Sequence, residues 1–461
     1  MKMDTPHILC VNPWIHDFAA FDFWAKPLGL LQIAAIIRAG GARVTFIDCL
    51  DRFHVNALEE GPVKVLEDGR GPFRKRIIPL PPAIALEIKG KRFSRYGIEP
   101  EWFRQDLRKL KAKNRPDLIL VTSLMTYWAS GVRETIALIK EVFPLTPVVL
   151  GGIYATLCRE HAQKHSLADQ VISGGAEGRI GSIVMEHTGF GLSGTAGVSS
   201  LYAPHLDDLP IPALDICKKL PYVPILTSRG CPFSCDYCAS SLLEPHFRRR
   251  SWISVFQEIS HWHNNYGVKN FAFYDDALLV DSEKHILPLL DAIVASPFSS
   301  RTAFHTPNAL HIRYISREIA GMMFRAGFRT IRLGLETMDF SKCRKGDTKV
   351  VENEFHHAVA MLREAGFLRE QIGAYLLCAL PGQNLDHLAH SISLVKKSGI
   401  VPVLAYYSPI PNTPMWQDAV RCSRFDLEND PLLTNNALLP CLGDSREIKK
   451  ILELKKLAQQ F

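Results

Sequence analysis

The chain has 461 residues, of which 47% are hydrophobic and 22% charged, and its formal net charge is +7. This composition is typical of a globular protein of two or three domains and excludes a disordered one. The sequence holds no run of eighteen apolar residues, so we expect no membrane-spanning helix. The first residues lack a signal pattern, which predicts a cytoplasmic protein. The charge is mild for this length, so nucleic acid is not an expected partner.

The first 187 residues alternate between short apolar runs and segments with helical spacing. The predicted strands are 7–12, 43–48, 118–123, 147–150 and 170–173, and the predicted helices between them are 28–38, 131–143 and 157–165. Such alternation predicts an α/β domain with a parallel, doubly wound, Rossmann-like sheet. Ligands of such sheets bind beyond the carboxyl ends of the strands.

A long basic stretch at residues 52–115 interrupts this alternation. It is punctuated by Pro and Gly, and its last part, 101–113, has the pattern of a helix. We interpret the stretch as an insertion carried on the sheet domain. Its charge indicates either a solvated face or a docking surface for an acidic partner.

A second series of strands and helices follows a linker rich in Gly, Ser and Pro at 188–220. The predicted strands are 223–228, 270–274, 302–305, 330–335, 371–376 and 401–406. Six such units predict a partial (β/α)6 barrel of the TIM type over 221–415, with chemistry at the carboxyl ends of the strands. The remaining residues, 416–461, are predicted to form a short helical tail that packs or caps.

Three of the eleven cysteines, Cys231, Cys235 and Cys238, lie within eight residues, directly after the first barrel strand. Thiolates are soft ligands and suit iron–sulfur chemistry. Three protein ligands leave one metal position open, as in a catalytic site. The alternatives are a structural zinc site with His246 as fourth ligand, an electron-transfer cluster, and chance clustering of core cysteines.

A C-x3-C-x2-C loop after the first strand of a (β/α)6 barrel resembles the radical S-adenosylmethionine (SAM) superfamily. The resemblance implies a [4Fe–4S] cluster on the three cysteines and SAM on its open iron. One electron, from a donor of the flavodoxin or ferredoxin type, would then cleave SAM to a 5′-deoxyadenosyl radical. The cofactor carries such chemistry while the protein orients it. The resemblance also implies that Tyr237 lies against the adenine; the alternative is loop packing.

Polar residues follow two further barrel strands. Asp275 and Asp276 end the second strand, where the resemblance implies binding of the SAM ammonium; the alternative is helix capping. In the fourth strand, alternation places Arg332 and Glu336 on one face. The resemblance implies that they contact SAM, and the alternative is a structural ion pair. The basic run 248–250 is either an anion site or surface charge.

The N-terminal domain resembles that of the cobalamin-binding subclass of this superfamily. The resemblance rests on Gly151 and Gly152 after the fourth strand, on the Pro27-Leu28-Gly29 turn and on the glycine-rich run 174–178. It implies a corrinoid at the strand ends, where Gly151 and Gly152 allow close backbone approach; the alternative is a plain turn. The Asp-x-His-x-x-Gly motif of some cobalamin domains is absent from the sequence, and the neighbours of His16 do not match it.

These features together predict a radical SAM enzyme that uses a [4Fe–4S] cluster, SAM and cobalamin. The first expected reaction is methylation of an unactivated carbon in a small-molecule or peptide substrate. One alternative is radical cyclisation or rearrangement without methyl transfer. Another is a non-enzymatic corrinoid- or metal-binding carrier.

Overall fold

The computed structural model describes residues 5–82, 84–85, 88, 90–193, 205–338 and 351–460. It divides the chain into two compact units. The first is Met1–Leu220 with Glu428–Thr434, and the second is Pro221–Leu427 with Asn435–Phe461. Within the described residues, no helix combines the length and the apolar character needed to cross a membrane.

The first unit is built on a sheet of five parallel strands in the order β3-β1-β6-β7-β8. The strands are β1 (His7–Asn12), β3 (Arg43–Asp48), β6 (Leu118–Val121), β7 (Val148–Leu150) and β8 (Gln170–Val171). This arrangement confirms the predicted doubly wound sheet. The strand order reverses between β1 and β6, which is the place where such sheets bind ligands.

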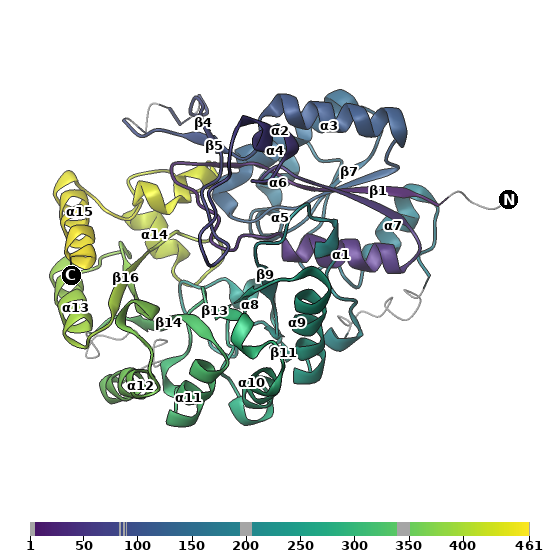
Figure 1. Cartoon of the computed structure of the whole chain (residues 1–461). Helices are drawn as coiled ribbons and strands as arrows, with labels where there is room; N and C mark the ends of the chain where they lie inside the picture. The colour runs from purple at the N-terminus through teal and green to yellow at the C-terminus, as the bar shows by residue number, and fades with distance from the viewer. Residues whose placement is uncertain are drawn as a thin grey trace. The chain divides into compact units, whose positions relative to one another are not determined.

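Helices cover both faces of this sheet, as Figure 1 shows. Helices α1 (Leu28–Ala39) and α7 (Ile180–Thr188) pack on one face, and α3 (Pro100–Lys113) and α4 (Ala129–Val142) on the other. Alternate strand residues face opposite layers, so Ile8 belongs to the α1 core and Leu9 to the α4 core. The shorter helices of this unit are α2 (Val55–Glu60), α5 (Ile153–Leu157) and α6 (Arg159–His165).

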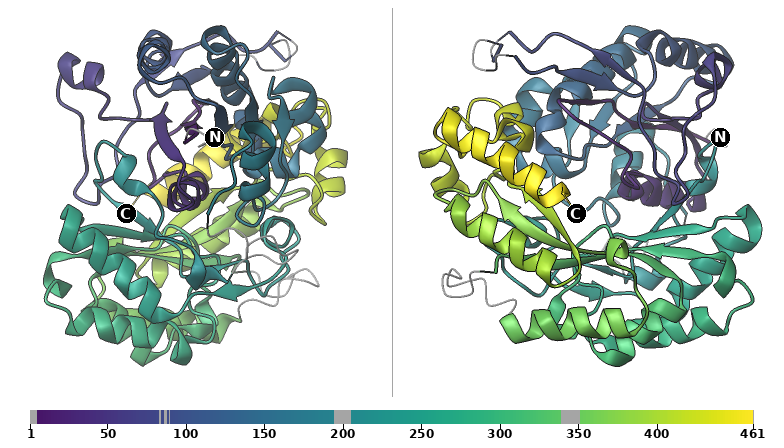
Figure 2. Two further views of the ribbon diagram at one scale, coloured as in Figure 1. Left: turned by 90° about the vertical axis from the view of Figure 1, so that its right-hand side faces the viewer. Right: turned by 60° about the vertical axis from the view of Figure 1, so that its left-hand side comes forward.

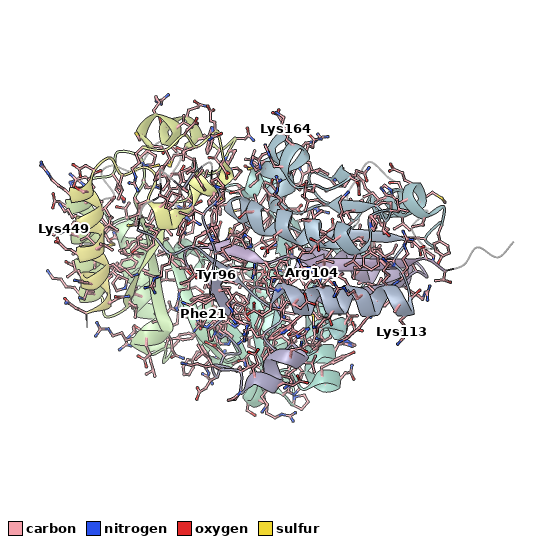
Figure 3. All side chains as sticks on the ribbon, turned by 90° about the horizontal axis from the view of Figure 1, so that it is seen from above. Phe21, Tyr96, Arg104, Lys113, Lys164 and Lys449 are labelled. Carbon is pink, nitrogen blue, oxygen red and sulfur yellow. The ribbon has the colours of Figure 1, made fainter. Side chains whose placement is uncertain are left out.

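The basic stretch at 52–115 forms structure that its sequence pattern predicted only in part. The helix at its end is α3, whose Arg104 and Lys113 are labelled in Figure 3. Before it, β4 (Lys75–Ile77) and β5 (Ser94–Tyr96) join β2 (Ile15–Asp17) in an antiparallel sheet. Strands of three residues are too short to show alternation, which explains why the sequence did not reveal them.

Several basic side chains of this stretch form local ion pairs. Arg74 lies 2.8 Å from Glu99, and Arg104 lies 3.1 Å from Glu141. Pairs of this exposed kind contribute little to stability, but they neutralise charge locally. The choice between a solvated face and a docking surface stays a prediction.

The second unit is built on six parallel strands that follow one another in sequence order. They are β9 (Val223–Ile225), β12 (Asn270–Phe273), β13 (Ala303–His305), β14 (Phe328–Glu336), β15 (Ile372–Cys378) and β16 (Val401–Tyr406). Each connection carries a helix, which confirms the predicted (β/α)6 unit. Since β9 and β16 are edge strands, the barrel is open.

The helices between the strands pack on the outside of the curved sheet (Figures 1 and 2). They are α9 (Trp252–Tyr266), α10 (Ile286–Ala295), α11 (Arg317–Arg325), α12 (Glu352–Glu364) and α13 (Leu385–Lys397). The single turn α8 (Ser240–Leu243) directly follows the three cysteines instead. A short hairpin, β10 (Ser228–Arg229) with β11 (Arg248–Arg249), closes the segment that carries the three cysteines.

The C-terminal tail is helical, as predicted, and it is divided between the two units. Helix α14 (Trp416–Cys422) belongs to the second unit, and α15 (Ser445–Gln459) packs beside α13 and β16 there. Between them, η9 (Pro431–Thr434) is buried in the first unit, against η1 (Thr126–Trp128) and α4. This return of the chain to the first unit was not predicted from the sequence pattern.

Candidate active site

The three clustered cysteines lie on one loop at the carboxyl end of β9. Cys235 is buried, and Cys231 and Cys238 are half-buried. Gly230 begins the loop with φ +78°, and a Cβ there would lie 3.0 Å from two backbone oxygens, so only glycine fits this turn. The loop thus leaves the hairpin at a fixed point and presents three soft donors within eight residues.

The donor set fits an iron–sulfur cluster, although the sulfur atoms are not gathered in advance. Within the described part of the chain, no three Cys, His, Asp or Glu side chains surround a common point as in a metal site. This holds for the three cysteines as well as for His246, so the choice between a cluster and a structural zinc site stays a prediction. The Ser240 amide donates to Cys238 Sγ at 3.5 Å, and hydrogen bonds to cluster sulfurs tune reduction potentials.

Asp275, at the end of β12, is buried and already holds the strand that precedes the cysteine loop. Its carboxylate accepts hydrogen bonds from the Thr227 amide at 3.1 Å, the Thr227 hydroxyl at 2.7 Å and the Ser228 hydroxyl at 2.6 Å. Its exposed fraction is 3%. Burial raises the pKa of this carboxyl group. A ligand would have to displace these donors to reach it, so its assignment to the SAM ammonium stays a prediction.

Asp276 is exposed and contacts the other end of the same loop. It accepts a hydrogen bond of 2.6 Å from the hydroxyl of Ser240, the first residue of α8. The two adjacent carboxylates therefore differ in environment, and both touch the segment that carries the cysteines. The binding of the SAM ammonium by Asp276 likewise stays a prediction.

Tyr237 and Glu336 are 99 residues apart in sequence, and the structure brings them together. The Tyr237 hydroxyl donates to Glu336 Oε1. Glu336 ends β14 with φ +68°, in the left-handed region that residues with a side chain rarely adopt. Ala379 and Asn412, which follow β15 and β16, also have φ near +65°. Such strain concentrates at functional sites, and here it marks neighbouring strand ends.

Arg332 and Glu336 both lie on β14, but the register with β15 shifts by one residue between Gly334 and Glu336, which interrupts the alternation expected from the sequence. Leu333 and Leu335 are buried under the helices, whereas Arg332 and Glu336 are half-buried. The guanidinium of Arg332 donates to the carbonyl oxygens of Ile331 at 2.9 Å and Gln371 at 3.5 Å. These partners lie near the start of β15, so the side chain is directed away from the strand end that Glu336 occupies.

The basic run at 248–250 is engaged by acidic neighbours. Arg250 pairs with Glu258, which is 1% exposed, and donates to the carbonyl of Leu226 at 3.1 Å. Arg249 lies 2.7 Å from Asp281. Since a buried Glu258 needs a cationic partner, Arg250 serves the packing of α9 against β9. These contacts favour a structural role for the run over an anion site.

His285 is a residue of the site that the sequence reasoning missed. It is 2% exposed, and its Nε2 lies 2.6 Å from the Thr227 hydroxyl. Because that hydroxyl directs its proton to Asp275, His285 Nε2 is the donor in this bond. Burial lowers the pKa of His285 to about 4, so the ring is neutral near pH 7. No signal near His285 in the sequence points to Thr227.

Gly151 and Gly152 line a pocket of about 160 Å³ in the first unit, at the carboxyl ends of β6 and β7. Its walls come from α1, β6, β7, the run 174–177 and α7. A Cβ on Gly152 would lie 2.3 Å from the Ser123 carbonyl oxygen, and its φ is +98°, so this position requires glycine. A Cβ on Gly151 or on Gly29, in α1, would meet no atom within 4 Å. These two glycines therefore leave open space in a mostly apolar pocket.

His16 is held by its own unit. Its Nε2 lies 2.7 Å from Glu134 Oε2, and its Nδ1 lies 3.2 Å from the Ser130 hydroxyl. The imidazole is 5% exposed. The ring thus lies against α4, with Nδ1 beside Ser130 and Nε2 within ion-pair distance of Glu134 but without hydrogen-bond geometry to it.

Comparisons with known proteins agree with this geometry. Residues 225–395 match the family model of the radical SAM superfamily. An uncharacterized methyltransferase from Pyrococcus horikoshii is 25% identical over 364 residues, which are 74% of this chain and 76% of the relative. The anaerobic magnesium-protoporphyrin IX monomethyl ester cyclase from Cereibacter sphaeroides is 25% identical over 351 residues, 70% of this chain and 55% of the relative.

The fold also matches a solved structure. The radical SAM methyltransferase TsrM from Kitasatospora setae, solved with cobalamin and a [4Fe–4S] cluster bound, superposes with a TM-score of 0.63 at 17% identity. The match covers 91% of this chain and 75% of that one. At this identity the match establishes the two-unit architecture and says nothing of substrate.

Proposed function

Since this chain belongs to the radical SAM superfamily through its domain at residues 225–395, we propose that it is a cobalamin-dependent methyltransferase acting on an unactivated carbon. When bound, the cluster and SAM supply a 5′-deoxyadenosyl radical, and cobalamin supplies a site for methyl transfer. The enzyme class follows from the family. The corrinoid and the methylation are the proposal.

The pocket beside Gly151 is the observation that carries the proposal. It lies at the carboxyl end of a doubly wound sheet, where such folds bind cofactors. Gly29 and Gly151 lack the side chains that would fill it, and its lining is mostly apolar. A flat, apolar part of a corrinoid fits such a space, and the methyltransferase names of the relatives support the same conclusion. Because His16 is engaged elsewhere, we propose that it does not ligate cobalt.

The residues of the second unit have proposed roles that follow from their positions. Cys231, Cys235 and Cys238 would hold the cluster. Tyr237 and Glu336 would orient SAM, because an aromatic ring and a carboxylate meet beside the cysteine loop. A carboxylate accepts strong hydrogen bonds from hydroxyl and ammonium groups, which SAM carries. The substrate would be a small molecule or a peptide, and a low-potential electron donor would reduce the cluster.

Corrinoid binding is tested with a substitution that fills the pocket with a larger side chain. Anaerobically purified protein is incubated with hydroxocobalamin and desalted, and its visible spectrum is recorded. We expect near-stoichiometric corrinoid in the wild type and little in Gly151→Leu, with the iron–sulfur absorbance unchanged. Gly321→Leu, on α11 in the other unit, is the control because its Cβ would meet only the end of the flexible Arg325 side chain, at 3.5 Å. Equal corrinoid in all three proteins would remove the pocket from the proposal.

A radical cyclisation without methyl transfer is the second candidate, and the cyclase relative favours it. The products of SAM distinguish the two reactions. Methylation yields S-adenosylhomocysteine together with 5′-deoxyadenosine, whereas cyclisation yields only the latter. A carrier without catalysis is not retained, because the radical SAM domain is that of an enzyme.

A further inference from the structure

Asp275 and Asp276 contact the cysteine loop at its two ends. Asp275 holds Thr227 and Ser228, which lie before Cys231, and Asp276 holds Ser240, which lies after Cys238. The dipeptide at the end of β12 therefore binds the cysteine loop on its N-terminal side, which we call the entry side, and on its C-terminal side, which we call the exit side.

We propose that this aspartate pair is a brace that sets the geometry of the cysteine loop for the cluster. Both residues are positioning residues, which act on the cluster through the loop. The inference rests on the proposed assignment of the three cysteines to a cluster. It does not depend on cobalamin or on methyl transfer.

The entry side of the brace is a buried hydrogen-bond chain. His285 donates to the Thr227 hydroxyl, which donates to Asp275, and the Ser228 hydroxyl donates to the same carboxylate oxygen. The Arg250 amide donates to the Thr227 carbonyl at 2.9 Å, so the hairpin side of Thr227 is held as well. Buried networks of this kind are rigid when every member is satisfied. The position from which the loop departs is therefore fixed within three residues of Cys231.

The β12 end that carries the brace is itself anchored. The Asn308 side-chain amide, from the segment after β13, donates to the carbonyl of Tyr274 at 2.7 Å. The neighbouring strand thus fixes the backbone just before Asp275. Without this hydrogen bond, the backbone that carries the two carboxylates would be free to move with the cysteine loop and would not hold the loop in place.

The exit side reaches a cluster ligand directly. Asp276 orients Ser240, whose amide donates to Cys238 Sγ. Backbone donors to a thiolate stabilise the reduced cluster and raise its potential. Loss of the Asp276 contact would leave the Ser240 amide present but no longer held in position to donate to Cys238 Sγ.

The test compares the cluster before SAM is added. We expect Asp275→Asn and Thr227→Val to lower the iron content of anaerobically reconstituted protein and to change the electron paramagnetic resonance signal of the reduced cluster. Thr227→Ser retains the hydroxyl and should match the wild type. Activity should fall roughly 10–100-fold in the first two variants, the range for residues that orient metal ligands. Circular dichroism checks that each variant is folded.

Asp276→Asn and Ser240→Ala test the exit side, where neither change removes a buried group. We expect Ser240→Ala, which removes the contact without a change of charge, to lower the reduction potential of the cluster. Asp276→Asn keeps an acceptor oxygen and loses a negative charge, so its potential should not fall below that of Ser240→Ala; a wild-type potential in Ser240→Ala would refute the exit side of the brace. If Asp275→Asn fails to fold, the proposal is tested with Thr227→Val, Asp276→Asn and Ser240→Ala.

The outcomes separate the brace from the other assignments. Wild-type cluster signals in all variants, with weakened SAM binding in the two aspartate variants, would overturn the brace and make both residues SAM ligands. A wild-type protein that holds no cluster would instead refute the radical SAM assignment of the cysteines. A wild-type cluster without corrinoid would leave the brace intact and count only against cobalamin.

Discussion

Replacing Glu336 by alanine and by glycine separates its proposed role in SAM binding from the strain of its backbone. With φ +68°, Glu336 bears a cost of about 1–2 kcal/mol, which alanine would share and glycine would not. Glycine loses about 0.5–1 kcal/mol through the greater freedom of the unfolded chain. Both variants lose the hydrogen bond from Tyr237, worth about 1 kcal/mol.

The two variants should therefore differ in stability and agree in function. We expect Glu336→Ala to be destabilised by about 1 kcal/mol and Glu336→Gly to be more stable than it by about 0.5–1 kcal/mol. For a unit of this size, the glycine variant should melt roughly 2 °C higher. If the carboxylate binds SAM through a charge-assisted hydrogen bond, both should lose about 10–100-fold in affinity, equivalent to about 1.5–3 kcal/mol.

Thermal unfolding by circular dichroism and anaerobic equilibrium binding of SAM measure the two effects. Leu167, in the first unit, also has φ +68°, so the pair Leu167→Ala and Leu167→Gly should show the same order of stability with unchanged SAM binding. Equal melting temperatures for the two Glu336 variants would refute the strain. Wild-type affinity in both would remove Glu336 from the SAM site.

Three further substitutions test other parts of the site. Gly152→Ala should destabilise the first unit by about 2 kcal/mol or more in denaturant unfolding, because φ at Gly152 is +98° and a Cβ there would clash with the Ser123 carbonyl oxygen. Gly151→Ala should be nearly neutral, and equal effects of the two substitutions would contradict the pocket geometry. His285 is neutral in the folded protein with a pKa of about 4, below the unfolded value of 6.5, so stability should fall as the pH drops from 6.5 toward 4, by up to about 3 kcal/mol. His285→Gln should flatten this dependence in urea titrations at stepwise pH, and an unchanged slope would exclude His285 as its source. Cys235→Ala should abolish both cluster absorbance and SAM cleavage, and full activity in that variant would refute the assignment of the loop.

The sequence predicted the parts of the site that depend on chain order. Parallel strands end at one edge, so residues that directly follow strands are bound to lie near one another. This reasoning placed Tyr237 and Glu336 after strands of the same sheet, but it did not predict the hydrogen bond that joins them. Gly151 and Gly152 were singled out by the resemblance to cobalamin-binding domains, and they line a pocket at the carboxyl ends of the strands that they follow.

The parts that the sequence could not show depend on which partner a side chain selects. Asp275 and Asp276 look alike in the sequence, yet one is buried and the other exposed. The difference arises because Thr227 and Ser228, almost fifty residues earlier, offer donors to the first carboxylate only. The same limit hid His285, whose partner lies 58 residues away.

The burial of Pro431–Thr434 in the first unit has a consequence for how this protein is made. The first unit lacks a buried part of its core until the chain has been synthesised past Thr434. A ribosome-bound chain that ends at Leu220 would therefore expose the apolar surface of η1 and α4 that this segment covers. The complete barrel must be translated before the first unit can finish folding, so the two units mature together rather than in the order in which they are encoded.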